Sequence, residues 1–256
     1  MIQSVQRATR LLSILADNYT QPVPLATLAA LSGLHKSTCA NLLATLEEEG
    51  YAIKISRSKG YILGSAAYCL SRFGAYKSQL VEVCRPVLQY LHRHTGHTVV
   101  LAIVESGTKY ILHSIDNNDI FDTKFLIQAD DIYRTATGRA ILVNLPREET
   151  AAIFRKYGDP TEKDWPEVRK FEDFTHFASK AKKTAVFKSR GCFVSDTILN
   201  IGYGVALFNA GGCVGAIGIA LKMPVEQEKN YTREEEDTIT RLLVRGAAEI
   251  NRRLSG

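Results

Sequence analysis

The chain has 256 residues, of which 45% are hydrophobic and 23% charged, and its formal net charge is +5. This composition indicates a globular protein, and no apolar run approaches the roughly 20 residues of a membrane span. Five scattered cysteines without a C-x-x-C pair argue against a disulfide framework or a zinc ribbon, so free thiols are expected.

The N-terminal segment predicts a first helix. It lacks the apolar h-region of a secretory signal, and we therefore expect a cytoplasmic protein. Ser4 is a suitable N-cap for a helix that ends near Asp17 and Asn18. The predicted apolar stripe of this helix is Val5, Ala8, Leu12 and Leu15.

Residues 25–51 contain two short amphipathic patterns separated by Gly33. The apolar face of the first is Leu25, Leu28 and Ala29, and that of the second is Cys39, Leu42, Leu43 and Leu46. The other face of the second pattern is slim and polar and includes Lys36, Ser37 and Asn41. Taken alone, an ordinary helical hairpin explains this as well as a helix-turn-helix does.

The flanking segments favour the helix-turn-helix. Two β-type runs, 51–55 and 61–63, are joined by a Gly-containing loop that carries Arg57 and Lys59 at its tip, as in a winged helix. Residues 1–75 contain seven Lys or Arg against four acids, a balance that suits a nucleic-acid partner. We therefore predict a winged helix-turn-helix DNA-binding domain over residues 1–64.

A linker helix is predicted over residues 65–77. The following helix has Leu80, Cys84, Leu88 and Leu91 on its inward face and ends at Thr95 and Gly96. Pro86 should begin or kink this helix.

The remaining sequence predicts an α+β domain over residues 78–256. A hairpin turn is expected at 106–107 and another at 209–212, and Thr232 with Glu235 forms a capping box before the last helix. That helix places Ile239, Leu242, Leu243 and Ile250 inward. The expected strands are 97–105, 109–115, 119–130, 192–196, 203–208 and 213–221, and the other expected helices begin at 135–138 and cover 148–157 and 167–184.

One possible ligand site follows from this pattern. Backbone N–H groups at a helix start near Ala136, Thr137 and Gly138 can bind a carboxylate or phosphate, although an ordinary helix cap explains them equally. Further expected lining residues are Ser195, Asp196 and Tyr203 as polar contacts, with Gly218 and Ala220 leaving room.

Metal and catalytic chemistry find little support. His92, His94 and His97 lack the spacing and the additional ligands of a zinc site. Cys192 has no histidine placed near it by a motif, so a buried thiol is the simpler interpretation. We expect no enzyme, no catalytic or metal-binding residue and no cofactor.

The whole chain resembles one family. SVQRATRLLSIL, PLATLAALSGLHKSTCANLLATLEEEGY and GYILG are similar to the winged helix of IclR-family bacterial transcription regulators. TGHTVVLAIVESG, TATGRAILVNLP and SRGC…GYGVALF…GCVGAIGIA resemble segments of the family's second domain. The resemblance implies a GAF-like α/β effector-binding domain with an antiparallel sheet, homodimers or homotetramers on partly palindromic operators, and a small organic or sugar-derived acid as effector.

The chain departs from the family's pattern at both sites. Ala40 and Asn41 stand where most members have a bulky residue and then Arg, so Asn41 is expected to read adenine instead. Gly202 occupies the place of a signature cysteine, and residues 197–199 replace an acidic stretch. With Gly218 and Ala220 in place of serines found in some members, either the effector is less polar or the pocket binds nothing tightly.

The leading hypothesis is a regulator, expected to be a repressor, that binds double-stranded operator DNA under control of a small-molecule effector. The residues expected to contact DNA are Arg7, His35, Lys36, Ser37, Thr38, Asn41, Arg57 and Lys59. Two alternatives remain open. One is an enzyme acting on a bound acid with Asp196 as its base, and the other is a DNA-binding oligomer without an effector.

Overall fold

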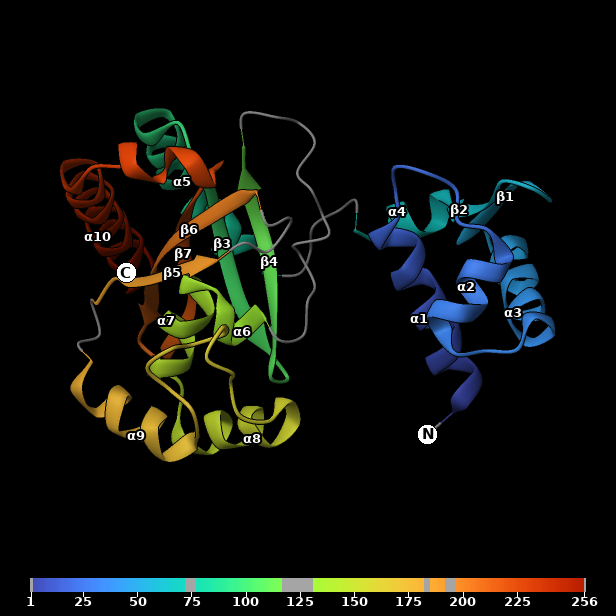
Figure 1. Cartoon of the computed structure of the whole chain (residues 1–256), viewed down its shortest axis with the longest axis horizontal. Helices are drawn as coiled ribbons and strands as arrows, with labels where there is room; N and C mark the ends of the chain where they lie inside the picture. Colours follow the sequence, from blue (N-terminus) through green and yellow to red (C-terminus); the bar gives the residue numbers. More distant parts are fainter. Residues whose placement is uncertain (1, 72–76, 117–130, 182–184, 192–196, 256) are drawn as a thin grey trace. The chain divides into compact units, whose positions relative to one another are not determined.

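The structure is a computed structural model that describes residues 2–71, 77–116, 131–181, 185–191 and 197–255. Two compact units divide the chain, one formed by residues 1–78 and the other by residues 79–256 (Figure 1). Within the described residues, no helix is long and apolar enough to cross a membrane.

The first unit is a winged helix-turn-helix, as predicted. Its core is formed by side chains from all three helices and the hairpin, among them the fully buried Leu11, Leu28 and Leu43. The elements are α1 (Gln3–Asp17), α2 (Leu25–Ser32), α3 (Lys36–Glu48), β1 (Ala52–Ser56), β2 (Gly60–Leu63) and the short helix α4 (Ser65–Ser71).

The turn between α2 and α3 depends on Gly33. Its φ is +70°, in the left-handed region that glycine adopts without steric cost. Its N–H donates to the carbonyls of Ala29 and Ala30, which closes α2. Cys39, Leu43 and Leu46 form the buried face of α3, whereas Leu42 is half-buried.

The first helix differs from the prediction at its start. α1 begins at Gln3 with Ile2 as the N-cap residue, so Ser4 lies inside the first turn. Val5, predicted to face inward, is 57% exposed. The buried residues are Leu11 and Leu15, which are four positions apart and therefore share a face.

The wing is a tight hairpin whose strands reach further than predicted. Ser56 pairs with Gly60, which leaves only residues 57–59 as the loop. A third segment joins the hairpin, because Val23 exchanges both backbone hydrogen bonds with Tyr61. Gly60 is required at this crossing, since a Cβ there would lie 2.1 Å from the Val23 carbonyl oxygen.

The second unit is built on an antiparallel five-stranded sheet with the order β4-β3-β7-β6-β5 (Figure 1). The turns at 106–107 and around 210–211 occur where they were predicted, and Ser106 and Gly107 both have the positive φ of a two-residue hairpin loop. The strands are β3 (Thr98–Glu105), β4 (Thr108–Ile115), β5 (Phe187–Gly191), β6 (Ile198–Asn209) and β7 (Gly212–Pro224).

Helices cover both faces of this sheet. Large aliphatic side chains such as Leu101, Ile217 and Val205 pack against α5 and α10 on one face. The other face is lined by Ala102, Ala206 and Ala216, and α7 lies against it. The helices are α5 (Ser78–Thr95), α6 (Asp131–Arg134), α7 (Ala136–Asn144), α8 (Arg147–Tyr157), α9 (Phe171–Lys180), α10 (Arg233–Ser255) and the 3-10 helix η2 (Val225–Asn230).

The capping box at the start of α10 is confirmed. The N–H and the hydroxyl of Thr232 both donate to Glu235 Oε2 at 2.8 Å, and the Glu235 N–H donates to Thr232 Oγ1 at 3.2 Å. These donors lower the pKa of the Glu235 carboxyl. Of the residues predicted to face inward on α10, Ile239, Leu243 and Ile250 are buried and Leu242 is half-buried.

Several elements differ from the predictions. The strand expected over 192–196 lies outside the described residues, and β5, over 187–191, was not predicted. α9 is shorter than predicted, because Trp165 and Val168 enter an aromatic cluster from irregular backbone. α5 continues through Pro86. The strand expected over 119–130 lies outside the described residues. The short helix α6, which follows them, was not predicted.

Candidate functional site

The outer face of α3 is exposed and polar. Ser37 and Asn41 are exposed and lie one turn apart, and Lys36 is exposed beside them at the start of the helix. Thr38 and Ala40 are half-buried. The N-cap residue His35 makes no side-chain cap, so the first backbone N–H groups of α3 are not capped by that side chain.

Exposed cations accompany this face within the first unit. Arg57 and Lys59 are both exposed in the wing loop. The loop is held by Ser56, whose Oγ accepts the Lys59 N–H at 3.0 Å. Arg7 is exposed on α1, whereas Arg10 donates to the Leu31 carbonyl and so ties α1 to the end of α2.

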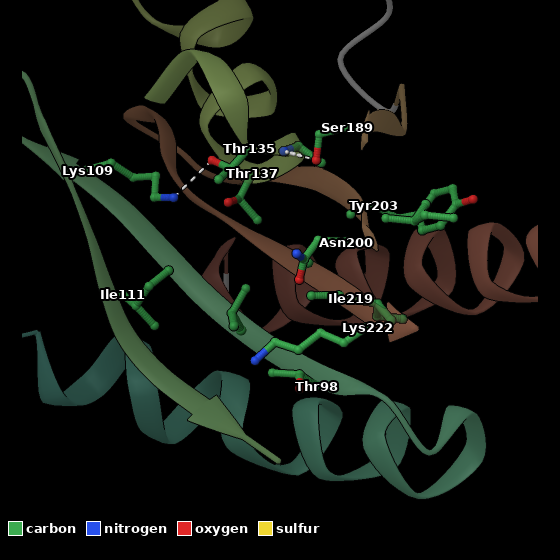
Figure 2. Close-up of a pocket in the computed structure, with 16 residues that line it drawn as sticks. Thr98, Lys109, Ile111, Thr135, Thr137, Ser189, Asn200, Tyr203, Ile219 and Lys222 are labelled. Carbon is green, nitrogen blue, oxygen red and sulfur yellow. Dashed lines mark hydrogen bonds between the residues drawn. The ribbon is translucent and has the colours of Figure 1, made fainter. Parts of the chain in front are cut away.

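The second unit contains a cavity of about 120 Å³ between the first turn of α7 and the sheet (Figure 2). Such a volume exceeds several times the space needed by one water molecule, about 10–15 Å³. Its lining combines apolar, hydroxyl and cationic groups. The lining residues include Thr98, Val100, Lys109, Ile111, Thr135, Ala136, Thr137, Ser189, Asn200, Gly202, Gly218, Ala220 and Lys222.

The N-terminus of α7 points into this cavity with most of its capping already in place. Thr135 is the N-cap residue, and its Oγ1 accepts the Gly138 N–H at 3.2 Å. Ser189 Oγ on β5 accepts the Ala136 N–H at 3.1 Å. Among the described residues the Thr137 N–H has no acceptor, so this donor is available to an anion at the positive end of the helix.

Lys109 brings a buried cation to the same end of the cavity. Its residue is only 4% exposed, and its Nζ donates to Thr135 Oγ1 at 2.9 Å. This hydrogen bond links β4 to the N-cap residue of α7 and so helps to hold the helix start at the cavity. Lys109 was not predicted, since nothing in the local sequence distinguishes this lysine from others on a strand.

Asn200 on β6 is the most informative polar residue of the cavity. It is 9% exposed, and its Nδ2 is buried without a hydrogen-bond partner in the described part of the chain. An unsatisfied buried donor costs about 1–3 kcal/mol, a cost that a ligand acceptor would remove. Lys222 pairs with Asn200 across β6 and β7, and its side chain also lines the cavity.

Two residues predicted for this site have other surroundings. Tyr203 lies on the face of the sheet covered by α5 and α10, and its hydroxyl accepts from Tyr231 at 3.2 Å. Burial raises the pKa of Tyr203. Tyr203 also borders the cavity, as predicted, although its ring packs on the other face of the sheet. Gly138 faces α6, because a Cβ there would lie 2.2 Å from the Ile132 carbonyl oxygen.

The other predicted residues divide into those that line the cavity and those the structure does not describe. Ala136, Thr137, Gly218 and Ala220 all line it. Ser195 and Asp196 lie outside the described residues, and so does Cys192.

Two of the three histidines that were considered and set aside as metal ligands lie against backbone carbonyls. His92 Nδ1 lies 2.8 Å from the His97 carbonyl, and His94 Nδ1 lies 2.8 Å from that of Tyr90. Across the described ranges, no three His, Cys, Asp or Glu residues are grouped closely enough to hold a metal ion.

Arg139 fixes the position of α7. Its guanidinium is buried and donates to the carbonyls of Tyr133, Lys188 and Asp164 at 2.9, 2.7 and 2.7 Å. It also lies over the Trp165 ring at 5.1 Å. Burial lowers the pKa of Arg139, and nearby carboxylates oppose that shift. One side chain thus joins α7 to β5 and to the segment before α9.

Comparison with known domains identifies the family. Residues 4–54 match the IclR helix-turn-helix domain, and residues 75–167 match the C-terminal domain of the bacterial transcriptional regulator IclR. Together the two matches cover more than half of the chain. The chain belongs to the IclR family of transcription regulators.

Individual members of the IclR family are distant from this chain. The acetate operon repressor of Salmonella typhimurium is 23% identical over 160 residues, 61% of this chain and 58% of that protein. The chain spans little more than half the length of the first curated relatives it matches.

Two solved IclR-family structures have the same fold. An IclR transcriptional regulator from Alicyclobacillus acidocaldarius superposes over the full length of both chains with a TM-score of 0.74 at 21% identity. An IclR homolog from Microbacterium hydrocarbonoxydans, complexed with 4-hydroxybenzoate, reaches 0.70 at 14% identity over 98% of each chain.

We expect the pocket to depend on the close seating of α7 at Gly204. Gly204→Ala would place a Cβ 2.5 Å from the Ala136 carbonyl carbon. This overpacking should lower the free energy of unfolding of the second unit by about 1–3 kcal/mol, measured by denaturant titration. Gly211→Ala is the matched control, since its Cβ would meet only Asn209 Oδ1, at 3.3 Å. Equal losses in both variants would contradict the close seating.

Proposed function

We propose that this IclR-family protein is a sequence-specific DNA-binding repressor whose operator binding is modulated by a small organic acid. The observation that carries the DNA-binding part is the outer face of α3. Ser37 and Asn41 are exposed on this face, opposite the buried apolar face of the same helix. Because bacterial operators lie in the cytoplasm, the proposal also places the protein there.

In this proposal α3 enters the major groove. Ser37, Thr38 and Asn41 contact base edges, and Asn41 pairs with the N6 and N7 groups of adenine. His35 and Lys36 lie at the N-terminus of α3, where backbone N–H groups favour a phosphate.

Arg57 and Lys59 in the wing, together with Arg7, supply further phosphate contacts, which add affinity without reading sequence. Two copies related by a twofold axis would read two half-sites, so we propose a homodimer, or a homotetramer built from dimers, on a partly palindromic operator.

The effector part of the proposal rests on the cavity under α7. The Thr137 N–H at the positive end of α7 suits a carboxylate, and the unsatisfied Asn200 donor calls for an oxygen acceptor on the ligand. Among the described lining residues there is no carboxylate, thiol or imidazole. The enzymatic alternative would therefore rest on Asp196 alone, and we do not propose it. The acid bound by the Microbacterium homolog, 4-hydroxybenzoate, belongs to the class proposed here.

Asn41→Ala should lower discrimination between operators. Losing a bidentate contact to adenine costs about 1–3 kcal/mol at the matched base pair. Gel-shift titration of an operator and of its variant at that base pair measures the difference. Ala44→Ser is a control on the same exposed face of α3, one turn further on. Retention of full discrimination by Asn41→Ala would contradict the groove assignment.

Lys59→Ala should weaken binding to all sequences alike. One phosphate contact fewer reduces the slope of log K against log salt by about one unit. Titrations at several salt concentrations measure this slope, and Lys163→Ala, in the second unit, provides a lysine control. A sequence-dependent loss would assign Lys59 to base contact instead.

An effector acid should stabilise the full chain against heat. A ligand present at 100 times its dissociation constant adds roughly 2.7 kcal/mol to the free energy of unfolding. Thermal-shift screening with aromatic, aliphatic and sugar acids measures this, and the corresponding neutral amides are the controls. A flat screen would favour the alternative in which the second unit only assembles the oligomer.

A further inference from the structure

The Asn200 side chain lines the cavity and lacks hydrogen-bond partners. It is 9% exposed, and its Nδ2 is buried without an acceptor in the described part of the chain. The hydrogen bonds among the described residues include none to its Oδ1 either. Figure 2 shows this side chain at the pocket, on the strand β6. The position therefore calls for a ligand group that satisfies a buried amide.

The matching ligand group is uncharged. Lys109 donates to Thr135, and Lys109 and Lys222 each have a further interaction within the chain. A carboxylate placed at Asn200 would be buried against an uncharged amide, and a buried charge without an ionic partner is costly. A neutral oxygen needs only the hydrogen bond itself. We therefore assign a neutral oxygen to this position.

A hydroxyl group suits the Asn200 amide better than a carbonyl or an ether. Both the donor and the acceptor of this amide lack partners among the described residues. A carbonyl or ether oxygen only accepts, whereas a hydroxyl has one donor and two lone pairs and can fill either role. The uncharged hydroxyl of Thr98 on β3 also lines the cavity, so the surroundings are those of a polar but neutral group.

The distance from Asn200 to the start of α7 decides where the hydroxyl stands on the ligand. The Thr137 N atom lies directly over Gly204, 2.6 Å from the place of a Cβ there. Asn200 is four residues earlier on the same face of β6, which separates its Cα from that of Gly204 by about 13 Å at about 3.3 Å per residue. The paired residues Gly202 and Ala220 lie between these positions and carry nothing larger than a methyl group.

We infer that the effector is a hydroxy acid whose hydroxyl stands several carbons away from its carboxylate. The carboxylate accepts from the Thr137 N–H at the start of α7, and the hydroxyl contacts Asn200. A hydroxyl on the carbon next to the carboxylate lies too close to it to reach both positions. This class of ligand narrows the proposed effector function, on which it rests, and Asn200 is the residue that determines the specificity.

Positional isomers of equal size and charge test this assignment on the full-length protein. Isothermal titration compares 4-hydroxybutyrate, 5-hydroxypentanoate and 6-hydroxyhexanoate with their 2-hydroxy isomers. At least one remote hydroxy acid should bind about tenfold more tightly than its isomer, because only its hydroxyl satisfies the buried amide. Equal binding of the isomers would overturn the inference and leave the effector function standing. If none of these acids binds, the inference fails, and the wider thermal-shift screen decides the effector function separately.

Variants at Asn200 assign the preference to this side chain. Asn200→Leu keeps the size and shape of the residue, and Asn200→Ala leaves more room. Each should bring the affinity ratio of the two isomers close to one. Because Asn200→Leu removes an unsatisfied buried donor, it should not lower the denaturation midpoint of the unliganded protein.

Asn251→Leu is the matched control. Asn251 lies on α10, outside the lining of the cavity, and its Oδ1 accepts the Phe208 N–H at 2.8 Å. Losing this satisfied bond should lower the denaturation midpoint and keep the isomer ratio. An unchanged ratio in the folded Asn200 variants, or a lowered midpoint in Asn200→Leu without loss of the ratio, would overturn the inference.

Discussion

The close approach of α7 to β6 and β7 determines the layout of the second unit. Gly204 and Gly218 allow it, because a side chain at either position would collide with the first turn of the helix. Small alanines continue the same surface on β3, β6 and β7. The opposite face carries large aliphatic residues under α5 and α10. The two faces of the sheet therefore differ in the size of their side chains and in how closely helices pack on them. One supplies most of the core, and the other holds a helix end close to the strands.

That seating also creates the ligand chemistry. A helix N-terminus pressed against a sheet concentrates donors where water has little access, and partial positive charge is felt more strongly there. Arg139 keeps the helix in place through three carbonyl acceptors on separate segments. Thr135 and Ser189 accept from two of the first N–H groups, and within the described ranges the Thr137 N–H is the one left without an acceptor. The proposed carboxylate position is therefore narrow, because most of the helix end is already capped.

In the first unit, the core and the wing hold polar and cationic side chains in exposed positions. Its core fills the inner faces of three helices and leaves the outer face of α3 without apolar side chains to bury. Val23 adds a third segment to the wing, and its bridge to Tyr61 anchors the base of the hairpin. The wing loop then needs only residues 57–59, which hold Arg57 and Lys59 in an exposed position. A helix that contacts base edges in the major groove of DNA needs polar side chains on a rigid support, and the first unit provides this arrangement.

Local patterns in the sequence determined most elements of the fold. Gly33, the apolar spacing of α3, the turn at 106–107 and the capping box at Thr232 each involve residues a few positions apart, so their geometry can be predicted from the chain alone. The resemblance to IclR-family regulators supplied the domain order. Predictions failed where the environment rather than the local pattern decides, as at Val5 and in the short α9, whose neighbour Trp165 joins an aromatic cluster.

Sequence patterns predicted part of the pocket, at Ala136, Thr137, Gly218 and Ala220, but not its lysine and asparagine side chains. Lys109, Asn200 and Lys222 come from three strands, and only the register of the sheet brings them to one cavity. Tyr203 shows the converse, since its position on β6 assigns its ring to the other face. A strand side chain changes faces with every residue, so a pocket's composition depends on non-local pairing. The sequence by itself determined that a winged helix-turn-helix precedes an α/β domain, and the tertiary structure alone decided which donors line the cavity.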